Sequence, residues 1–193
     1  MTHAGPIREV YVSVDVETAG PNPGLYSLLS IGACLVAEPE RTFYVELQPV
    51  KNRAEKEALA VHGLSLEKLR VEGVPPADAM AQFEAWLARE IPPPVRPLFV
   101  AFNAPFDWMF VNDYFHRFLG RNPFGHNAID IKAYYMGLSG SSWADTSLDK
   151  LMARYTGPAR LSHNALEDAK DQAAIFRVLL EEAAIRRLPS DNP

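Results

Sequence analysis

The sequence predicts an α/β fold in which a mixed central β-sheet, with its first three strands antiparallel, is flanked by α-helices. Three short runs rich in β-branched and aromatic residues occupy the first quarter of the chain, with turn residues between them. Helical patterns then alternate with two further short apolar runs, which favours helices packed on a mixed sheet. We expect a single domain over 1–193, with a core from about 8 to 184 and flexible termini.

The first three strands are predicted from alternation and turn signals. The run 10–16 alternates apolar with small or polar residues and ends near Glu17, before a turn rich in Gly and Pro. The runs 26–36 and 42–47 are rich in Ile, Leu, Val, Phe and Tyr, and 38–41 reads as a turn between them. Together they favour a three-stranded antiparallel meander.

The middle of the chain alternates between helix and strand. Residues 54–70 read as short helical pieces interrupted at Gly63, and 76–90 places several apolar side chains on one helical face. The proline-rich segment 91–97 is short enough for a stiff loop within one domain. The apolar run 98–102 fits a buried strand.

The helix after this strand should contain Pro105 in its first turn and extend to about Leu119, so that Asp107 also lies in the first turn.

The C-terminal third is expected to be mainly helical. Residues 127–131 fit one more short strand, and 132–137 and 146–155 have helical patterns. The last helix begins after His163, with Asn164 as N-cap and Glu167 three residues later, as in a capping box. Asp168 then lies in the first turns of this helix.

Composition excludes several classes of protein. A net charge of −5 and a pI near 5.5 argue against a broadly basic surface that holds nucleic acid, so any such site must be local. The single Cys34 allows no internal disulfide, and the five histidines lack zinc-site spacing. No apolar run is long enough to span a membrane and no secretory signal is recognisable, so a cytoplasmic protein is expected.

Acidic residues occur where strands and helices meet. Asp15 and Glu17 are two residues apart at a strand end, so their side chains share one face and can share one ion. Each acid also has an ordinary interpretation. The pair can be a solvated strand end, and Asp107 and Asp168 can be helix-start acids stabilised by the helix dipole.

Taken together and in their order along the chain, these acidic residues and a histidine indicate a function more specifically than any one of them does. Asp-x-Glu ends the first strand, Asn103 precedes Asp107 by four residues, and His163 precedes Asp168 by five. This set resembles the DEDD exonucleases of the histidine branch, DEDDh, which includes ribonuclease T and polymerase proofreading subunits. The tyrosine branch would need Tyr four residues before Asp168, where this chain has Asn164.

The resemblance covers about 12–175 and includes two further motifs, Ser-Ile-Gly-Ala at 30–33 and Val-His-Gly-Leu at 61–64. It departs in small ways, since Ser30 stands where many relatives have an acid, and Ala-Gly-Pro follows Thr18. These departures concern the substrate loop more than the chemistry.

The resemblance implies a ribonuclease H-like fold and an enzyme, a two-metal-ion 3′→5′ exonuclease that hydrolyses phosphodiester bonds at the 3′ end of single-stranded DNA or RNA and releases nucleoside 5′-monophosphates. It also implies a catalytic set of five residues. Four would be metal ligands and one the general base: Asp15, Glu17, Asp107 and Asp168, with His163.

Two Mg²⁺ ions are the expected cofactors, with Mn²⁺ able to substitute, because oxygen ligands suit both ions. Two cations about 4 Å apart can activate a water and stabilise charge on the phosphate. The resemblance implies that Asp15 would bridge the ions and that Glu17 and Asp168 would complete the site of the ion that activates water. Asp107 would hold the other ion through water. Proximity to a helix N-terminus and to cations should keep His163 neutral and able to accept a proton.

The substrate contacts implied by the resemblance are Thr18, Leu28, His62, Leu64 and Asn103. For each of them, ordinary loop or core packing is an equal alternative, because stacking on bases needs geometry that sequence does not supply. The expected partners are single-stranded DNA or RNA 3′ ends and no membrane. A homodimer and a polymerase partner are left open.

Two other functions compete with catalysis. One is a nucleic-acid-binding or polymerase-associated proofreading module whose main role is partnership, and the other is a domain that retains the fold for stability alone. A missing acid or histidine would favour the last, and all five residues are present. The intact set favours an enzyme.

Overall fold

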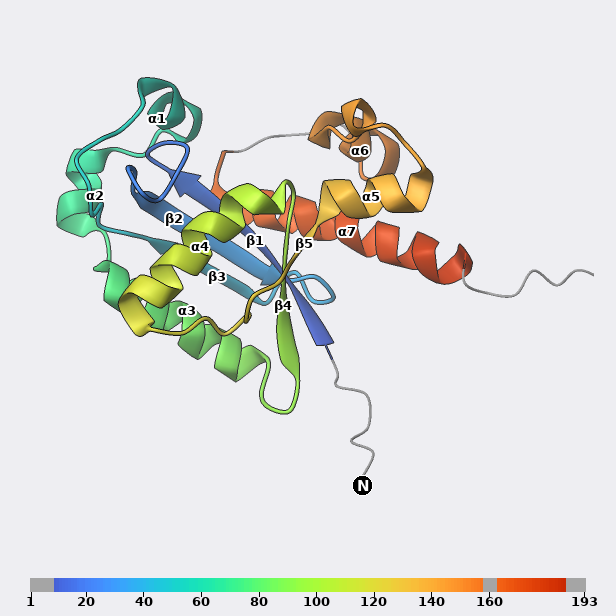
Figure 1. Cartoon of the computed structure of the whole chain (residues 1–193), viewed down its shortest axis with the longest axis horizontal. Helices are drawn as coiled ribbons and strands as arrows, with labels where there is room; N and C mark the ends of the chain where they lie inside the picture. The colour runs from blue at the N-terminus through green and yellow to red at the C-terminus, as the bar shows by residue number, and fades with distance from the viewer. Residues whose placement is uncertain (1–8, 158–162, 187–193) are drawn as a thin grey trace, which may run out of the picture.

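A computed structural model describes residues 9–157 and 163–186, and the flexible termini expected from the sequence lie outside these ranges (Figure 1). The chain forms a five-stranded sheet with the order β3-β2-β1-β4-β5. β1 pairs antiparallel with β2, which pairs antiparallel with β3, whereas β4 and β5 run parallel to β1. The mixed sheet and its antiparallel first three strands are confirmed. The strands are β1 (Glu9–Thr18), β2 (Leu28–Leu35), β3 (Thr42–Glu46), β4 (Arg96–Ala101) and β5 (Ala128–Asp130).

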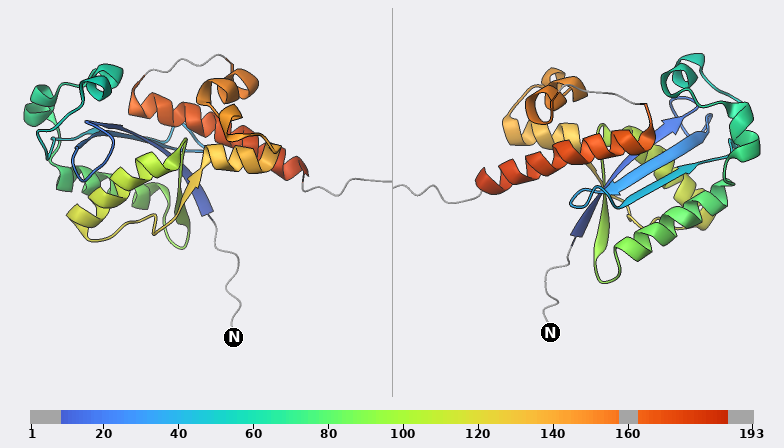
Figure 2. Two further views of the ribbon diagram at one scale, coloured as in Figure 1. Left: turned by 45° about the horizontal axis from the view of Figure 1, so that its top comes forward. Right: turned by 180° about the vertical axis from the view of Figure 1, so that it is seen from behind.

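Helices cover both faces of the sheet (Figures 1 and 2). The helices are α1 (Lys56–His62), α2 (Leu66–Glu72), α3 (Pro76–Glu90), α4 (Ala104–Leu119), α5 (Ile131–Ser139), the 3₁₀ turn η1 (Trp143–Asp145), α6 (Leu148–Tyr155) and α7 (Ala165–Arg186). Helices α3 and α4 pack on one face, and α7, with α5 and α6 against it, packs on the other. None of the described helices is both long and apolar enough to cross a membrane.

Two hydrophobic clusters correspond to the two faces of β1. Val12, Val14 and Val16 belong to the cluster under α3 and α4. Tyr11 contacts the other cluster, and its ring lies 5.3 Å from that of Phe176 on α7. This alternation follows from the pleat, which points successive side chains to opposite faces. Asp15, in the same alternation as Tyr11, therefore faces α7.

The predicted boundaries differ from the observed ones by a few residues. β1 and β4 begin earlier than expected because Glu9 pairs with Arg96 and Val10 with Pro97 in the parallel ladder. α5 begins at Ile131 because the Asp130 side chain accepts a hydrogen bond from the Ala133 N–H as its N-cap. Gly63 ends α1 in the left-handed conformation, which confirms the break predicted there.

Candidate active site

Three carboxylates from two elements converge at the C-terminal end of β1. Asp15 and Glu17 lie on β1, and Asp168 lies in the first turn of α7. One oxygen from each lies within 4.8 Å of the others, and all three residues are partly exposed. Because carboxylate oxygens are the preferred ligands of hard divalent cations, this cluster is a candidate metal centre.

Gly32 permits the close approach that brings Asp168 to this end of the sheet. Gly32 is the partner of Asp15 across the β1–β2 ladder. A Cβ atom at this position would lie 2.2 Å from the backbone carbonyl of Ala165, the first residue of α7. The N-terminus of α7 thus rests directly on the backbone of β2, which only glycine allows.

Asp107 reaches the same end of β1 from the opposite face of the sheet. It is buried in the first turn of α4, and its Oδ1 accepts a hydrogen bond of 3.1 Å from the Val16 N–H. Burial raises the pKa of Asp107 well above its ordinary value, against the effect of its backbone hydrogen bonds, and the charges of Glu17 and Asp130 raise it further. Asp107 therefore interacts electrostatically with Glu17, but it is not one of the three residues whose carboxylate oxygens lie within 4.8 Å of one another.

Without bound cations, repulsion within the carboxylate cluster lowers the stability of the folded protein. Burial is the main cause that raises the pKa of Asp15 well above its usual range, followed by the neighbouring charges of Asp107, Glu17 and Asp168. Burial and the charge of Asp168 raise the pKa of Glu17 from 4.5 to about 8. Divalent cations would relieve this repulsion, so the residues present fit such ions.

A metal-dependent change in stability should follow from these pKa values. A carboxyl whose folded-state pKa is raised binds more protons when folded, so Glu17 destabilises the metal-free fold as pH rises from about 4.5 to about 8. Below this window the effect is absent, and above it the effect is complete. A divalent cation must displace these protons at low pH, so it should stabilise the protein more at high pH.

Thermal unfolding with EDTA or with excess Mg²⁺ measures this effect. A cation at about tenfold its Kd contributes about 1.4 kcal/mol, which raises Tm by about 3–6 °C for a domain of this size. We expect this increase near pH 8 and a smaller one near pH 5. The Glu17→Gln variant should reduce the difference between the two pH values, to which Asp15 also contributes, and an equal Mg²⁺ effect at both in the parent protein would contradict the assignment.

Gln172 on α7 holds Asp15 in place, and sequence reasoning missed it. Its buried side chain donates from Nε2 to Asp15 Oδ1 at 2.6 Å and accepts at Oε1 from the Phe102 N–H at 2.9 Å. The amide thus connects β1, the end of β4 and α7. The available signal was a polar side chain in register with the buried positions Ala165, Ala169 and Phe176 of α7.

Asp130, which the sequence analysis also did not select, positions the starts of α4 and α5. Its Oδ2 accepts from the Ala104 N–H at 2.6 Å and its Oδ1 from the Ala133 N–H at 2.7 Å. These groups belong to the first turns of α4 and α5. One carboxylate therefore fixes the helix start that carries Asp107 relative to the start of α5.

His163 lies at the entry to α7, two residues before the helix begins. It is exposed, and its φ of 50° is in the left-handed region that only a few per cent of non-glycine residues adopt. Asn164 accepts hydrogen bonds at Oδ1 from the Leu166 and Glu167 N–H groups at 3.1 and 3.3 Å, which confirms it as the helix cap. The cap sets the direction in which the chain enters α7.

His62, at the end of α1, connects this helix to the end of β1. Its Nδ1 accepts from the Leu64 N–H at 3.0 Å, so in the neutral ring the proton is on Nε2, which lies 3.2 Å from the Thr18 carbonyl oxygen. Burial lowers the pKa of His62, and the charge of His163 lowers it further. His62 therefore links the end of α1 to the end of β1 through the Thr18 carbonyl.

The five predicted substrate contacts do not share one environment. Thr18 is buried and its hydroxyl donates to the Gly20 carbonyl at 2.9 Å, while Leu64 packs in a small cluster under α1 and α2. Asn103 is exposed, with a φ of 64°, at the start of α4. Leu28 is completely buried, and its N–H donates to the Tyr114 hydroxyl. In this structure Leu28 is a core residue with no surface for a base.

A pocket of about 230 Å³ lies between α1 and the end of β1. Its lining contains Glu17, Thr18 and His62, with Val16, Ala58, Val61 and Phe106. Val61 is 52% exposed; it belongs to the 61–64 motif quoted from the sequence but was not among the predicted substrate contacts. The pocket therefore combines a carboxylate of the cluster with an apolar wall.

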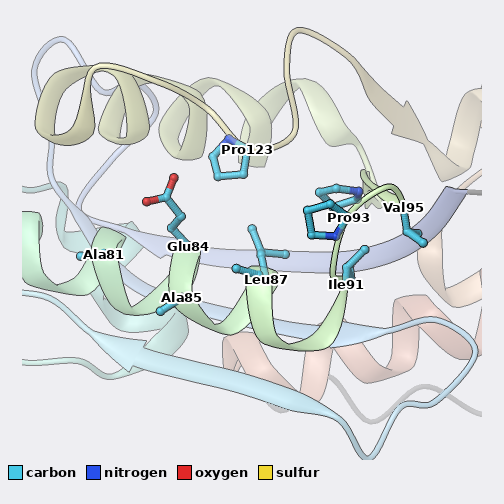
Figure 3. A pocket seen from close by; sticks show the side chains of 10 residues that line it. Ala81, Glu84, Ala85, Leu87, Ile91, Pro93, Val95 and Pro123 are labelled. Carbon is cyan, nitrogen blue, oxygen red and sulfur yellow. The ribbon is translucent and has the colours of Figure 1, made fainter. Parts of the chain in front are cut away.

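A second pocket, of about 420 Å³, lies at the other end of the sheet (Figure 3). Leu87 and Ile91 of the α3 end, with Pro93, Val95 and Pro123, form its apolar lining. Glu84 at its rim is paired with Arg121 through contacts of 2.8 and 2.6 Å. Arg96 and Pro97 pair with the start of β1, so this pocket is far along β1 from Asp15.

Comparison with known proteins by sequence shows the family of this chain. The family model described as Exonuclease (RNase_T) matches residues 12–176. A relative described as the 3′-5′ DNA exonuclease Cap18 of Escherichia coli is 47% identical over 172 residues, which cover 89% of this chain and 92% of the relative.

Solved structures share the fold at low sequence identity. The nuclease domain of 3′hExo, a DEDDh family member bound to rAMP, superposes with a TM-score of 0.74 at 15% identity, over 93% of this chain and 95% of that one. Exonuclease I of Escherichia coli in complex with a dA16 oligonucleotide superposes with a TM-score of 0.67 at 15% identity, over 94% of this chain and 42% of that one.

Proposed function

The chain belongs to the exonuclease family, as a 3′→5′ exonuclease of the DEDDh type with a ribonuclease H-like fold, and from this premise we propose that it removes nucleotides from the 3′ end of single-stranded DNA. The products would be nucleoside 5′-monophosphates and the cofactors two Mg²⁺ ions, with Mn²⁺ as a substitute. The observation that carries the proposal is the convergence of Asp15, Glu17 and Asp168 within 4.8 Å.

We favour DNA over RNA because the relative that is 47% identical is described as a DNA exonuclease. The carboxylate cluster itself does not discriminate between the two sugars. That choice depends on groups near the 2′ position of the terminal nucleoside. The pocket formed by Thr18, Val61 and His62 is the proposed site for this nucleoside, because it adjoins Glu17 and has an apolar wall.

The proposed catalytic roles follow from the geometry of the chain. Asp15, Glu17, Asp107 and Asp168 would hold the divalent ions, which when bound activate water and stabilise the charge on the phosphate. Gln172 keeps the Asp15 carboxylate oriented by donating to its Oδ1. His163, exposed at the entry to α7, would take the proton from the attacking water. His62 would hold the pocket wall in position through its contact with Thr18.

Incubation with 5′-labelled single-stranded DNA and RNA of matched sequence tests this proposal. With Mg²⁺ we expect a ladder that shortens from the 3′ end, on DNA more than on RNA, and no ladder with EDTA. A matched DNA that carries the label at its 3′ end should release labelled mononucleotide at once. Internal cuts, shortening from the 5′ end, or strand binding without any shortening would contradict the exonuclease proposal.

A further inference from the structure

A lysine and an exposed tryptophan meet at the start of α5. The Lys132 ammonium lies 4.1 Å from the centroid of the Trp143 ring and 5.8 Å from that of Phe102. Trp143, in the turn η1, is 53% exposed despite this contact. We call the pair Lys132 and Trp143 the lysine–tryptophan surface. An aromatic ring held by a cation–π contact but still open to solvent is a platform on which another flat ring can stack.

This surface is linked to the carboxylate cluster through a chain of three contacts, which begins with that between Lys132 and Phe102. Phe102, whose ring lies under Lys132, donates its N–H to Gln172, and Gln172 donates to Asp15. Asp130 receives hydrogen bonds from the first turns of both α4 and α5, so α5 starts beside the helix start that carries Asp107 (Figure 1). The lysine–tryptophan surface therefore lies on the α5 side of the end of β4, and Phe102 and Gln172 connect it to Asp15.

Lys132 also supplies an unneutralised positive charge. Within the part of the chain that the structure describes, no carboxylate lies within 4.0 Å of its ammonium. Asp145, close in sequence to Trp143, is paired with Lys150 at 2.9 Å and accepts from the Ser142 hydroxyl at 2.6 Å. Asp130 is occupied by two backbone N–H groups. In a chain of net charge −5, such a local cation is what a polyanionic strand requires.

We propose that the lysine–tryptophan surface binds the substrate strand on the 5′ side of the scissile bond, with a base stacked on Trp143 and a backbone phosphate beside Lys132. This inference rests on the proposed function, because it takes the strand to leave the carboxylate cluster toward α5. It adds a second subsite to the terminal-nucleoside pocket. A strand that reaches both should bind more tightly than one too short to reach the second.

The length of the DNA substrate distinguishes an effect on this subsite from an effect on the catalytic centre. For Trp143→Ala we expect about a tenfold loss of kcat/KM on a twelve-nucleotide DNA strand, through KM, and no loss on a dinucleotide. Lys132→Gln should weaken binding of the long strand and reduce the salt dependence of log Kd by about 0.7, as expected for one lost phosphate contact to a single strand. Lys150→Gln is the matched control, because its ammonium is already paired with Asp145.

Binding is measured independently of hydrolysis with a twelve-nucleotide phosphorothioate oligothymidylate that carries a 5′ fluorophore, by anisotropy in Mg²⁺. Trp143→Ala should raise Kd about tenfold, and Trp143→Phe, which keeps a flat ring, should restore most of the affinity. An unchanged Kd, an equal loss on the dinucleotide, or no binding by the unmodified protein would overturn the inference. If the protein binds through this surface but shortens no 3′ end, the proposed function fails and the subsite stands.

Discussion

The Asp15→Asn variant is expected to lose at least about 10³-fold in the rate of 3′-end hydrolysis while it keeps its fold. Asp15 belongs to the three-carboxylate cluster and is coupled to Asp107 as well, so its charge acts on every proposed metal ligand. Loss of several kcal/mol of charge stabilisation in the transition state corresponds to at least about three orders of magnitude in rate. Asparagine has the same shape and can still accept the hydrogen bond from Gln172.

The same variant should be more stable than the parent protein in EDTA near pH 8. Burial and the neighbouring carboxylates raise the pKa of Asp15, so its ionised form destabilises the metal-free fold, and asparagine removes that charge. Single-turnover hydrolysis and thermal unfolding in EDTA measure the two effects. Asp78→Asn, at an exposed position in the first turn of α3, is the matched control: it should keep the parent rate and should not raise stability, because an acid at a helix start is stabilised by the helix dipole. A rate within tenfold of the parent protein would remove Asp15 from the metal site.

Replacement of His163 is expected to lower turnover by about 10²–10⁴-fold, the usual contribution of a positioned general base. His163→Asn is the preferred variant, because the φ of 50° at this position is tolerated by asparagine better than by alanine. The carboxylates remain, so the rise in Tm caused by Mg²⁺ should be retained. Loss of rate with metal binding intact would separate a proton-transfer role from a structural one.

The pH–rate profile gives a sharper test of His163. A general base contributes a limb in which the rate rises with pH, and this limb should disappear in His163→Asn. His116→Ala, on the exposed side of α4, is the matched control and should keep both rate and profile. A parallel profile at reduced rate would show that His163 acts by holding the entry to α7, and the general-base role would be wrong.

The sequence predicted the elements of this protein well because their signals are local. Alternation identified β1, and a break at Gly63 separated α1 from α2, since pleat and left-handed cap depend on adjacent residues. The candidate acids were selected by the resemblance to the DEDDh exonucleases, and local patterns placed them on their elements. Asp15 and Glu17 share a face by the period of a strand, and Asp168 was placed in the first turns of α7 by the cap at Asn164.

Contacts between distant segments were decided only in the tertiary structure. Leu28 was predicted to contact a base, yet it is buried, because the antiparallel pairing of β1 with β2 and the Tyr114 hydroxyl draw it into the core. Val61, quoted in a motif but not selected as a substrate contact, is exposed and lines the pocket that contains Glu17. The side of a strand or helix that becomes solvent-facing depends on what packs against it, which periodicity alone does not specify.

The candidate metal ligands were therefore predicted from the sequence, whereas the contacts that orient them were determined by the fold. Gln172 and Asp15 are 157 residues apart in the sequence and share a hydrogen bond. Lys132, Phe102 and Trp143 lie in three separate segments, and Lys132 contacts both rings. A side-chain hydrogen bond or a cation–π contact leaves no local pattern in the chain, because its geometry exists only after the sheet and α7 have packed. Gly32 shows this dependence on packing most directly, because the backbone of α7 occupies the place that a Cβ atom of residue 32 would fill.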